Sequence, residues 1–86
     1  MFTVRRTNSA LAQLADLWTN ADAMLRKAIT AAANEIDQRL QHGPNAEGES
    51  RDHGQRVFFP GPLGAEFEVS GSVVRVMRIW LLRRRK

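Results

Sequence analysis

Apolar residues recur along this chain with two different periods, a helical one in the first half and a strand-like one in the second. Over residues 10–18, and again over about 21–41, they recur every three or four positions, which predicts two amphipathic helices. Gly43-Pro44 ends the second helix, because proline cannot continue it. Over residues 65–69, apolar residues alternate with glutamates, which is typical of a half-exposed strand.

Polar residues with capping side chains precede both helical segments. Asn8 or Ser9 is expected to cap the first helix, and Thr19-Asn20 offers a cap for the second. Asp22 would then lie in the first turn, where a negative charge interacts favourably with the helix dipole. The polar stretch 45–54 contains two glycines and predicts a loop.

Further strands are predicted on both sides of the helical half. Residues 2–7 are short and contain β-formers, and residues 56–59 precede a turn at 60–62. Gly71-Ser72 suits a two-residue hairpin turn with glycine in the first position. Residues 73–82 are almost continuously apolar, which predicts a central strand covered on both faces.

The predicted order is therefore β-α-α-β-β-β, an α+β fold. The helical hairpin is expected to pack on one face of a small, mainly antiparallel sheet, because both apolar stripes need a surface to cover. The first strand is expected beside the last one or at an edge. Residues 1–86 are too few for more than one core, so they form a single domain, with 82–86 as a basic tail.

The composition excludes several classes of protein. The chain has no cysteine, so disulfides and thiolate metal sites are excluded and a reducing, cytoplasmic location is expected. Apolar runs fall far short of the roughly 20 residues that cross a bilayer. The N-terminal segment lacks the continuous apolar core of a signal peptide. We therefore expect a soluble protein that does not contact a membrane.

Positive charge is concentrated in the second half of the chain. Residues 1–50 contain five basic and six acidic residues, a net charge of −1, whereas residues 51–86 contain eight and three, a net of +5. Charge of one sign on part of a fold attracts phosphate polymers or acidic protein segments. The alternative is that the basic end only aids solubility.

Most catalytic signatures are missing. There is no phosphate-binding glycine loop, no Gly-x-Ser-x-Gly motif, and neither cysteine nor tyrosine. Of the two histidines, His42 and His53, only the latter has a possible second metal ligand nearby, at Asp52. We expect no metal, no cofactor and no small-molecule partner.

The aromatic residues are mostly expected inside the protein. Those that continue apolar stripes should lie in the core: Trp18, Phe58, Phe59 and Phe67. Trp80 has two possible roles, packing against the helices, which is favoured, or stacking on an RNA base. Glu66 and Glu68 are expected on a solvated strand face.

The arginines are the remaining candidates for chemistry. RNA cleavage needs no metal when the 2′-hydroxyl attacks the neighbouring phosphate, because the protein then supplies positive charge and a proton carrier. A shared phosphate-sized catalytic site is expected from residues on or next to neighbouring strands: Arg51, Arg56, Arg78 and Arg83, with His53 as the proton carrier. Nucleic-acid contacts are expected from Arg75, Trp80, Arg84, Arg85 and Lys86.

Several short motifs together resemble a known family. In order along the chain they are Gly48-Glu49-Ser50-Arg51, Arg56-Val57-Phe58-Phe59, Pro62-Leu63-Gly64, Phe67-Glu68-Val69 and Val73-Val74-Arg75-Val76. Following two helices, they resemble the RelE/ParE superfamily of toxins from bacterial type II toxin–antitoxin pairs, also called the plasmid stabilisation family. The nearest likeness is to a divergent branch with the GESR motif.

The resemblance implies a RelE-like toxin neutralised by a cognate antitoxin whose C-terminal segment wraps around it. Members such as RelE cut messenger RNA on the ribosome, and ParE-type members poison DNA gyrase. The basic residue early in the second strand of the family falls on Arg56, and the arginine after the last strand falls on Arg83. The arginine that ribonuclease members place at the start of the third strand falls on or beside Gly64, and their C-terminal tyrosine is absent. The implied function is a toxin, either an mRNA interferase or a non-catalytic protein that binds gyrase, its antitoxin or nucleic acid.

Overall fold

The computed structural model describes residues 1–47, 49–50 and 54–82. Its elements are β1 (Thr3–Arg6), α1 (Asn8–Thr19), α2 (Ala23–His42), the 3-10 helix η1 (Pro44–Ala46), β2 (Glu49–Ser50), β3 (Gln55–Phe58), β4 (Leu63–Ser70) and β5 (Val73–Leu81). The predicted order is confirmed with one addition. The stretch 45–54, predicted as a loop, also contains η1 and β2. A two-residue strand is too short to show a period in the sequence, and it forms by pairing with β3.

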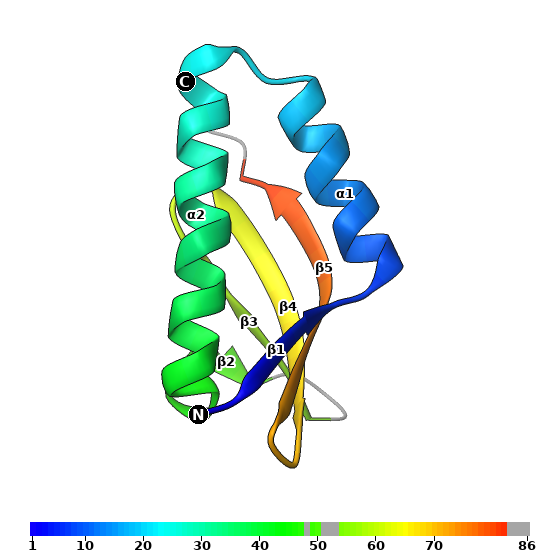
Figure 1. Ribbon diagram of the computed structural model, residues 1–86, viewed down its shortest axis with the longest axis vertical. Helices are drawn as coiled ribbons and strands as arrows, with labels where there is room; N and C mark the ends of the chain where they lie inside the picture. Colours follow the sequence, from blue (N-terminus) through cyan, green and yellow to red (C-terminus); the bar gives the residue numbers. More distant parts are fainter. Residues whose placement is uncertain (48, 51–53, 83–86) are drawn as a thin grey trace.

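The strands form one mixed sheet in the order β1-β5-β4-β3-β2. β1 runs parallel to β5 and the other pairs are antiparallel, so the sheet is mainly antiparallel as predicted. The first strand lies both at an edge and beside the last strand. Figure 1 shows α1 and α2 in one layer over a single face of this sheet. The other face, which we call the open face, carries no helix among the described residues.

The two helices begin at caps other than those predicted. The Thr7 hydroxyl accepts a hydrogen bond from the Ala10 N–H at 3.1 Å, and Asp22 accepts one from the Leu25 N–H at 2.8 Å. Asn8 lies inside α1, so the prediction of Asn8 or Ser9 as the cap was wrong. Thr7 takes this role because it directly follows β1 in extended conformation. For α2, Asp22 is the cap itself rather than a residue of the first turn.

The core lies between the helix layer and the sheet. The largest fully buried side chains include Ile29, Ile36 and Leu40 of α2 and Phe67 of β4. Phe58 also lies in the core, where its ring meets that of Phe67 edge-on at 5.3 Å, so both predictions are confirmed.

Two aromatic residues predicted in the core are exposed. Trp18 is 43% exposed and Phe59 is 50% exposed. The apolar stripe of α1 is wider than the surface it covers, because Leu14 and Leu17 pack on the core while Trp18 lies at the margin. Phe59 directly follows the buried Phe58, so it points to the opposite side of the strand.

β5 is internal to the sheet but is covered on only one face. Val74 and Val76 point into the core, whereas Arg75 and Arg78 lie exposed on the open face. The prediction that both faces are covered was therefore wrong, because both helices lie on the same side. None of the helices described here is long and apolar enough to span a membrane.

Candidate functional site

A β-bulge in β5 determines which residues reach the open face. Glu66 of β4 pairs with Arg78, and the next residue, Phe67, pairs with Val76, so Met77 is an extra residue in β5. Strict alternation would place Arg75 and Arg78 on opposite faces. The extra residue brings both onto the open face, together with Trp80.

The arginines of the open face are ion-paired with glutamates of β4. The Arg78 guanidinium donates to both carboxylate oxygens of Glu66, at 3.1 and 3.4 Å. Arg75 donates to Glu68 at 3.2 Å. Glu66 and Glu68 thus do lie on a polar strand face, as predicted, and they neutralise the arginines opposite them in register. Exposed pairs of this kind are worth about 1 kcal/mol or less, so their main effect is on the local charge.

An arginine that the sequence analysis did not single out joins this face from β1. Arg5 lies opposite Arg75 in the parallel β1–β5 pair. The two line a surface hollow of about 450 Å³ together with Glu68, Ser70 and Val73. The sequence did not show which of the adjacent Arg5 and Arg6 is exposed, nor the register of β1 against β5. Like charges opposite each other repel. Of Arg5 and Arg75, only Arg75 has an acidic ion-pair partner among the described residues, so Arg5 leaves one uncompensated positive charge here.

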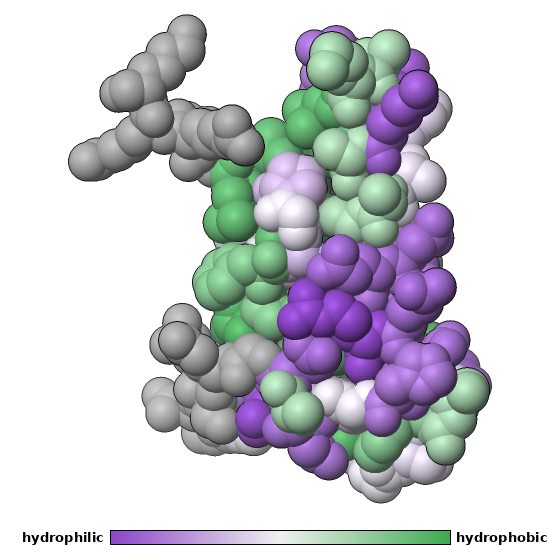
Figure 2. All heavy atoms as spheres, turned by 90° about the vertical axis from the view of Figure 1, so that its left-hand side faces the viewer, coloured by the Kyte–Doolittle hydropathy of each residue, from purple (hydrophilic) through white to green (hydrophobic). Residues whose placement is uncertain are grey.

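The other end of the open face is aromatic. The indole of Trp80 lies against the backbone of Gly64, its register partner, and Phe59 meets it edge-on at 6.5 Å between ring centroids. The guanidinium of Arg78 lies 5.7 Å from the indole centroid. The favoured prediction that Trp80 packs against the helices was wrong, because the bulge at Met77 turns it outward. In Figure 2, a hydrophobic area borders the hydrophilic surface of α2 on this side of the molecule.

Arg56 lies on the opposite face of the sheet from Arg78. It pairs in register with the buried Phe67, and its guanidinium donates to the carbonyl oxygens of Asn45 at 2.9 Å and Glu47 at 3.1 Å. Arg56 therefore holds η1 against the helix side of the sheet. The expectation that Arg56 and Arg78 share a phosphate-sized site was wrong, because they point to opposite faces of the sheet and their strands, β3 and β5, are separated by β4.

The remaining predicted site residues lie outside the described residues. These are Arg51, His53, Arg83, Arg84, Arg85 and Lys86. Their roles stay predictions.

A second arginine cluster stands beside Arg56. Arg39 of α2 donates to Glu35 at 2.8 Å and also to Glu47, and its guanidinium lies 5.1 Å from the Phe58 ring centroid. These hydrogen bonds, with Glu47 the stronger partner, raise the pKa of Arg39 above its ordinary value. Arg39 thus binds the side-chain carboxylate of Glu47, and Arg56 binds the backbone carbonyl of Glu47. The cluster fixes the segment that leads into β2.

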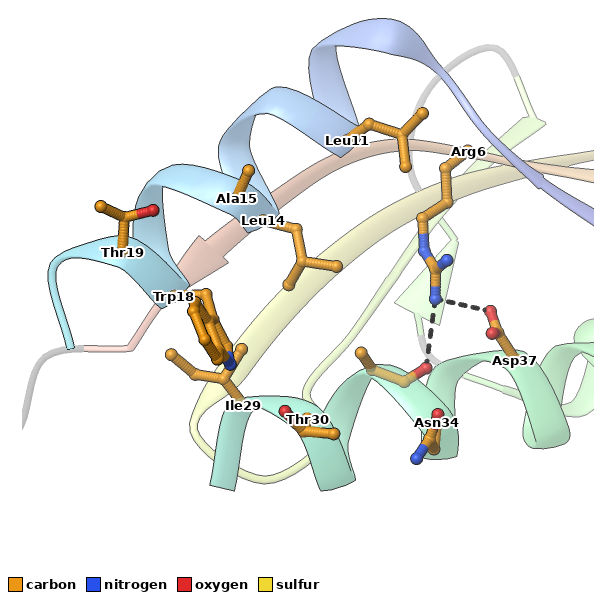
Figure 3. Close-up of a pocket in the computed structure, with 11 residues that line it drawn as sticks. Arg6, Leu11, Leu14, Ala15, Trp18, Thr19, Ile29, Thr30, Asn34 and Asp37 are labelled. Atoms are coloured by element: carbon orange, nitrogen blue, oxygen red, sulfur yellow. Dashed lines mark hydrogen bonds and ion pairs between the residues drawn. The ribbon is translucent and has the colours of Figure 1, made fainter. Parts of the chain in front are cut away.

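The helix layer contains a groove between α1 and α2 (Figure 3). It has a volume of about 450 Å³ and is lined by Arg6, Leu11, Leu14, Ala15, Trp18, Thr19, Ile29, Thr30, Ala33, Asn34 and Asp37. Leu11, 48% exposed, and the partly exposed Trp18 are its large apolar side chains open to solvent. The sequence analysis missed this groove, since it depends on how far apart two helices lie.

One polar group points from β1 into the groove, toward α2 (Figure 3). Arg6 of β1 donates to Asp37 at 2.9 Å and to the Ala33 carbonyl at 3.4 Å. Its side chain is only 22% exposed, and its Nε is buried with no hydrogen-bond partner among the described residues. The groove therefore combines apolar walls with a partly buried ion pair.

Comparisons with solved structures identify the fold. The chain superposes on a chain from the chromosomal ParDE TA system of P. aeruginosa with a TM-score of 0.79 and 21% identity, over 96% of this chain and 98% of that one. The chain has the RelE/ParE fold. A second RelE/ParE-type match, from the toxin–antitoxin complex RelBE2 of Mycobacterium tuberculosis, has a TM-score of 0.70 and 16% identity, over 93% and 90% of the two chains. The predicted RelE-like architecture is thereby confirmed. No protein-family model and no curated protein matches the sequence.

The described surface of this RelE/ParE-like domain combines charged, aromatic and apolar areas. Among residues 1–47, 49–50 and 54–82, no group of three His, Cys, Asp or Glu side chains is placed to hold a metal ion. The described surface offers ion-paired arginines and an aromatic cluster on the open face, and an apolar groove on the helix layer. Each is suited to contact with a macromolecule.

Proposed function

We propose that this protein is the toxin of a type II toxin–antitoxin module and that its direct partner is a cognate antitoxin. The observation that carries the proposal is the match to a chain of the ParDE TA system over nearly the whole of both chains. A fold supports many functions, so the surfaces must support the proposal separately.

The groove between the helices is the surface that best suits an antitoxin. Large apolar side chains exposed beside a groove are typical of sites that bind other proteins. Leu11 and Trp18 offer such contacts. An antitoxin segment with apolar side chains would cover both residues.

The open face favours a toxin that acts by binding its target over one that cuts RNA. Cleavage needs preorganised positive charge at the reacting phosphate, and losing one donor costs on the order of a hundredfold or more. Here Arg78 is neutralised by Glu66, and Arg56 points away from that face. Trp80 fills the space that a side chain at Gly64 would need. A protein target such as DNA gyrase is consistent with a toxin that acts by binding.

An mRNA interferase is the second candidate, and one observation favours it. Trp80 and Arg78 form a cation–aromatic cluster on an open sheet, a combination that binds single-stranded RNA in other proteins. In this alternative the cluster holds the message, and the basic residues that follow β5 contact its phosphates.

Induced expression in a bacterial host tests the proposal. We expect growth arrest that is reversed by co-expressing the small protein encoded beside this gene, with full-length messenger RNA and loss of DNA supercoiling. Unchanged growth with folded protein present would overturn the toxin assignment. Cleaved messenger RNA would overturn the binding mode and select the interferase.

Matched variants separate the surfaces. Leu11→Ala with Trp18→Ala should keep toxicity and lose neutralisation by the antitoxin, whereas Arg78→Ala should keep neutralisation. If the groove variant is still neutralised, the antitoxin binds elsewhere.

A further inference from the structure

Arg26 links the two helices at the end of the groove. It lies in the first turns of α2 and reaches back across the helical connection to the end of α1. Its Nε donates to the Trp18 carbonyl at 2.9 Å and its Nη2 to the Thr19 carbonyl at 3.2 Å. The last turn of α1 carries no basic residue, so Arg26 supplies from α2 the positive charge that this helix end favours.

The same guanidinium also covers the Trp18 side chain. Its central carbon lies 4.3 Å from the centroid of the indole ring, within the range of a cation–π contact. Arg26 therefore contacts both the backbone and the ring of one residue. Rotation of the exposed indole away from α2 would break the ring contact.

Trp18 stands between two hollows rather than at the edge of one. Beyond the groove, a second hollow of about 410 Å³ is lined by Trp18, Arg26, Lys27, Thr30, Ala31 and Asn34. Trp18, Thr30 and Asn34 line both hollows. A segment that covers the indole would thus meet apolar walls on one side and two cations on the other.

The charge of the second hollow is not compensated by a neighbouring acid. In the part of the chain that the structure describes, no carboxylate forms an ion pair with Arg26 or Lys27. By contrast, Arg75 and Arg78 of the open face each have a glutamate partner. A carboxylate supplied by a binding partner would form an ion pair with Arg26 or Lys27.

We propose that Arg26 is a positioning residue for partner binding. It holds Trp18 as a preformed anchor and, with Lys27, selects a partner segment that places an acidic side chain beside the apolar one covering the indole. The identity of the partner as an antitoxin rests on the proposed function. The fixed position of Trp18 does not depend on that function. A side chain already fixed loses no rotamer freedom on binding, which corresponds to roughly a 2- to 10-fold gain in affinity.

Fluorescence tests the positioning without any partner. The chain has two tryptophans, so Trp80→Phe leaves Trp18 as the only emitter. In this background, Arg26→Met should increase the local mobility of the indole in time-resolved anisotropy and shift its emission to the red. Lys27→Met, which removes the neighbouring cation, should change neither. Unchanged Trp18 anisotropy in the Arg26→Met variant would overturn the positioning role.

A double-mutant cycle tests the effect on binding, with the protein encoded beside this gene as the probe. Arg26→Met should weaken binding about tenfold in the parent and clearly less in a Trp18→Ala background, where only the attraction between Arg26 and the partner's acid remains to be lost. A purely structural role would weaken binding equally in both backgrounds and would overturn the proposal. Arg26→Lys keeps the positive charge but does not hold the indole in place. Its affinity should therefore lie between those of the parent and Arg26→Met.

Variants of the probe test the selection of an acid. One Asp→Asn or Glu→Gln change in the probe should remove the difference in affinity between the parent and Lys27→Met. If every such change leaves that difference in affinity intact, the prediction of an acidic side chain in the partner is wrong. The positioning role of Arg26 is then judged from the fluorescence result alone. A probe that fails to bind the parent at all counts against the proposed function, and the fluorescence result still decides the role of Arg26.

Discussion

The indole of Trp80 covers the backbone of Gly64 so closely that a β-carbon there would lie 2.3 Å from the ring. Real side chains do not tolerate such a contact, so Gly64→Ala must push the indole off the sheet. We expect a loss of about 1–3 kcal/mol in the free energy of unfolding, measured by urea denaturation. In a Trp18→Phe background, the emission of Trp80 should also shift to the red.

Gly43 provides the matched control. A β-carbon at Gly43 would meet no atom within 4 Å, so Gly43→Ala should leave the Trp80 emission unchanged. If Gly64→Ala has the stability and emission of the parent, the indole does not rest on this backbone.

The same contact shows where sequence reasoning failed. The period of residues 65–69 correctly predicted an alternating strand, and the hairpin turn at Gly71, where φ is 59°, was also correct. The favoured packing of Trp80 against the helices was nevertheless wrong, since an extra residue at Met77 places Trp80 on the open face. A bulge is specified by pairing with a neighbouring strand, and one strand's sequence does not reveal it.

The candidate site was predictable only where it depended on local pattern. The pairing of Glu66 and Glu68 with arginines follows from alternation once the register is known. The helix groove depends on the spacing of two helices over a sheet, and the opposite orientations of Arg56 and Arg78 depend on register. The net charge of +5 over residues 51–86 already includes Glu66 and Glu68, but it does not show that these two acids lie on the same face as Arg75 and Arg78 while Arg56 lies on the other.

Neutralisation of Arg78 by Glu66 predicts a gain of function. Glu66→Gln should free the guanidinium and increase affinity for single-stranded poly(U), measured by fluorescence anisotropy. Each added phosphate contact steepens the slope of log K against log salt by about 0.7 for single strands. Glu35→Gln is the control, because Glu35 pairs with Arg39 on the helix side. Equal slopes for the two variants would mean that Arg78 is not available to phosphate even when unpaired.

The Arg39 cluster predicts a contribution to stability that does not depend on pH near neutrality. Hydrogen bonds from Glu47 and Glu35 raise the pKa of Arg39, so the folded protein favours its charged form. A raised pKa gives stability that is fully present below the unfolded value and is lost only as pH rises through the folded one. For an arginine this window lies in strong alkali.

Arg39→Gln should therefore lower the free energy of unfolding by about 0.5–1 kcal/mol, since the side chain is 40% exposed and the pairs are partly screened. The difference from the parent should be the same at about pH 6 and about pH 9, because both values lie far below the pKa of Arg39. A difference that changes between these two values would contradict a contribution that depends on the charge of Arg39 alone.

The ion pair inside the helix groove predicts opposite results for single and double substitutions. Asp37→Ala leaves the guanidinium of Arg6, which is only 22% exposed, with the Ala33 carbonyl as its remaining described partner. We expect a loss of about 1–2 kcal/mol, below the roughly 3–5 kcal/mol of fully buried pairs, because Asp37 itself reaches solvent. Replacing both partners, as Arg6→Met with Asp37→Leu, removes the buried charge together with its unpaired Nε, and should recover most of that loss in urea denaturation. If the double variant is less stable than Asp37→Ala, the Arg6–Asp37 ion pair itself stabilises the fold. Its presence then needs no explanation from a partner that binds in the groove.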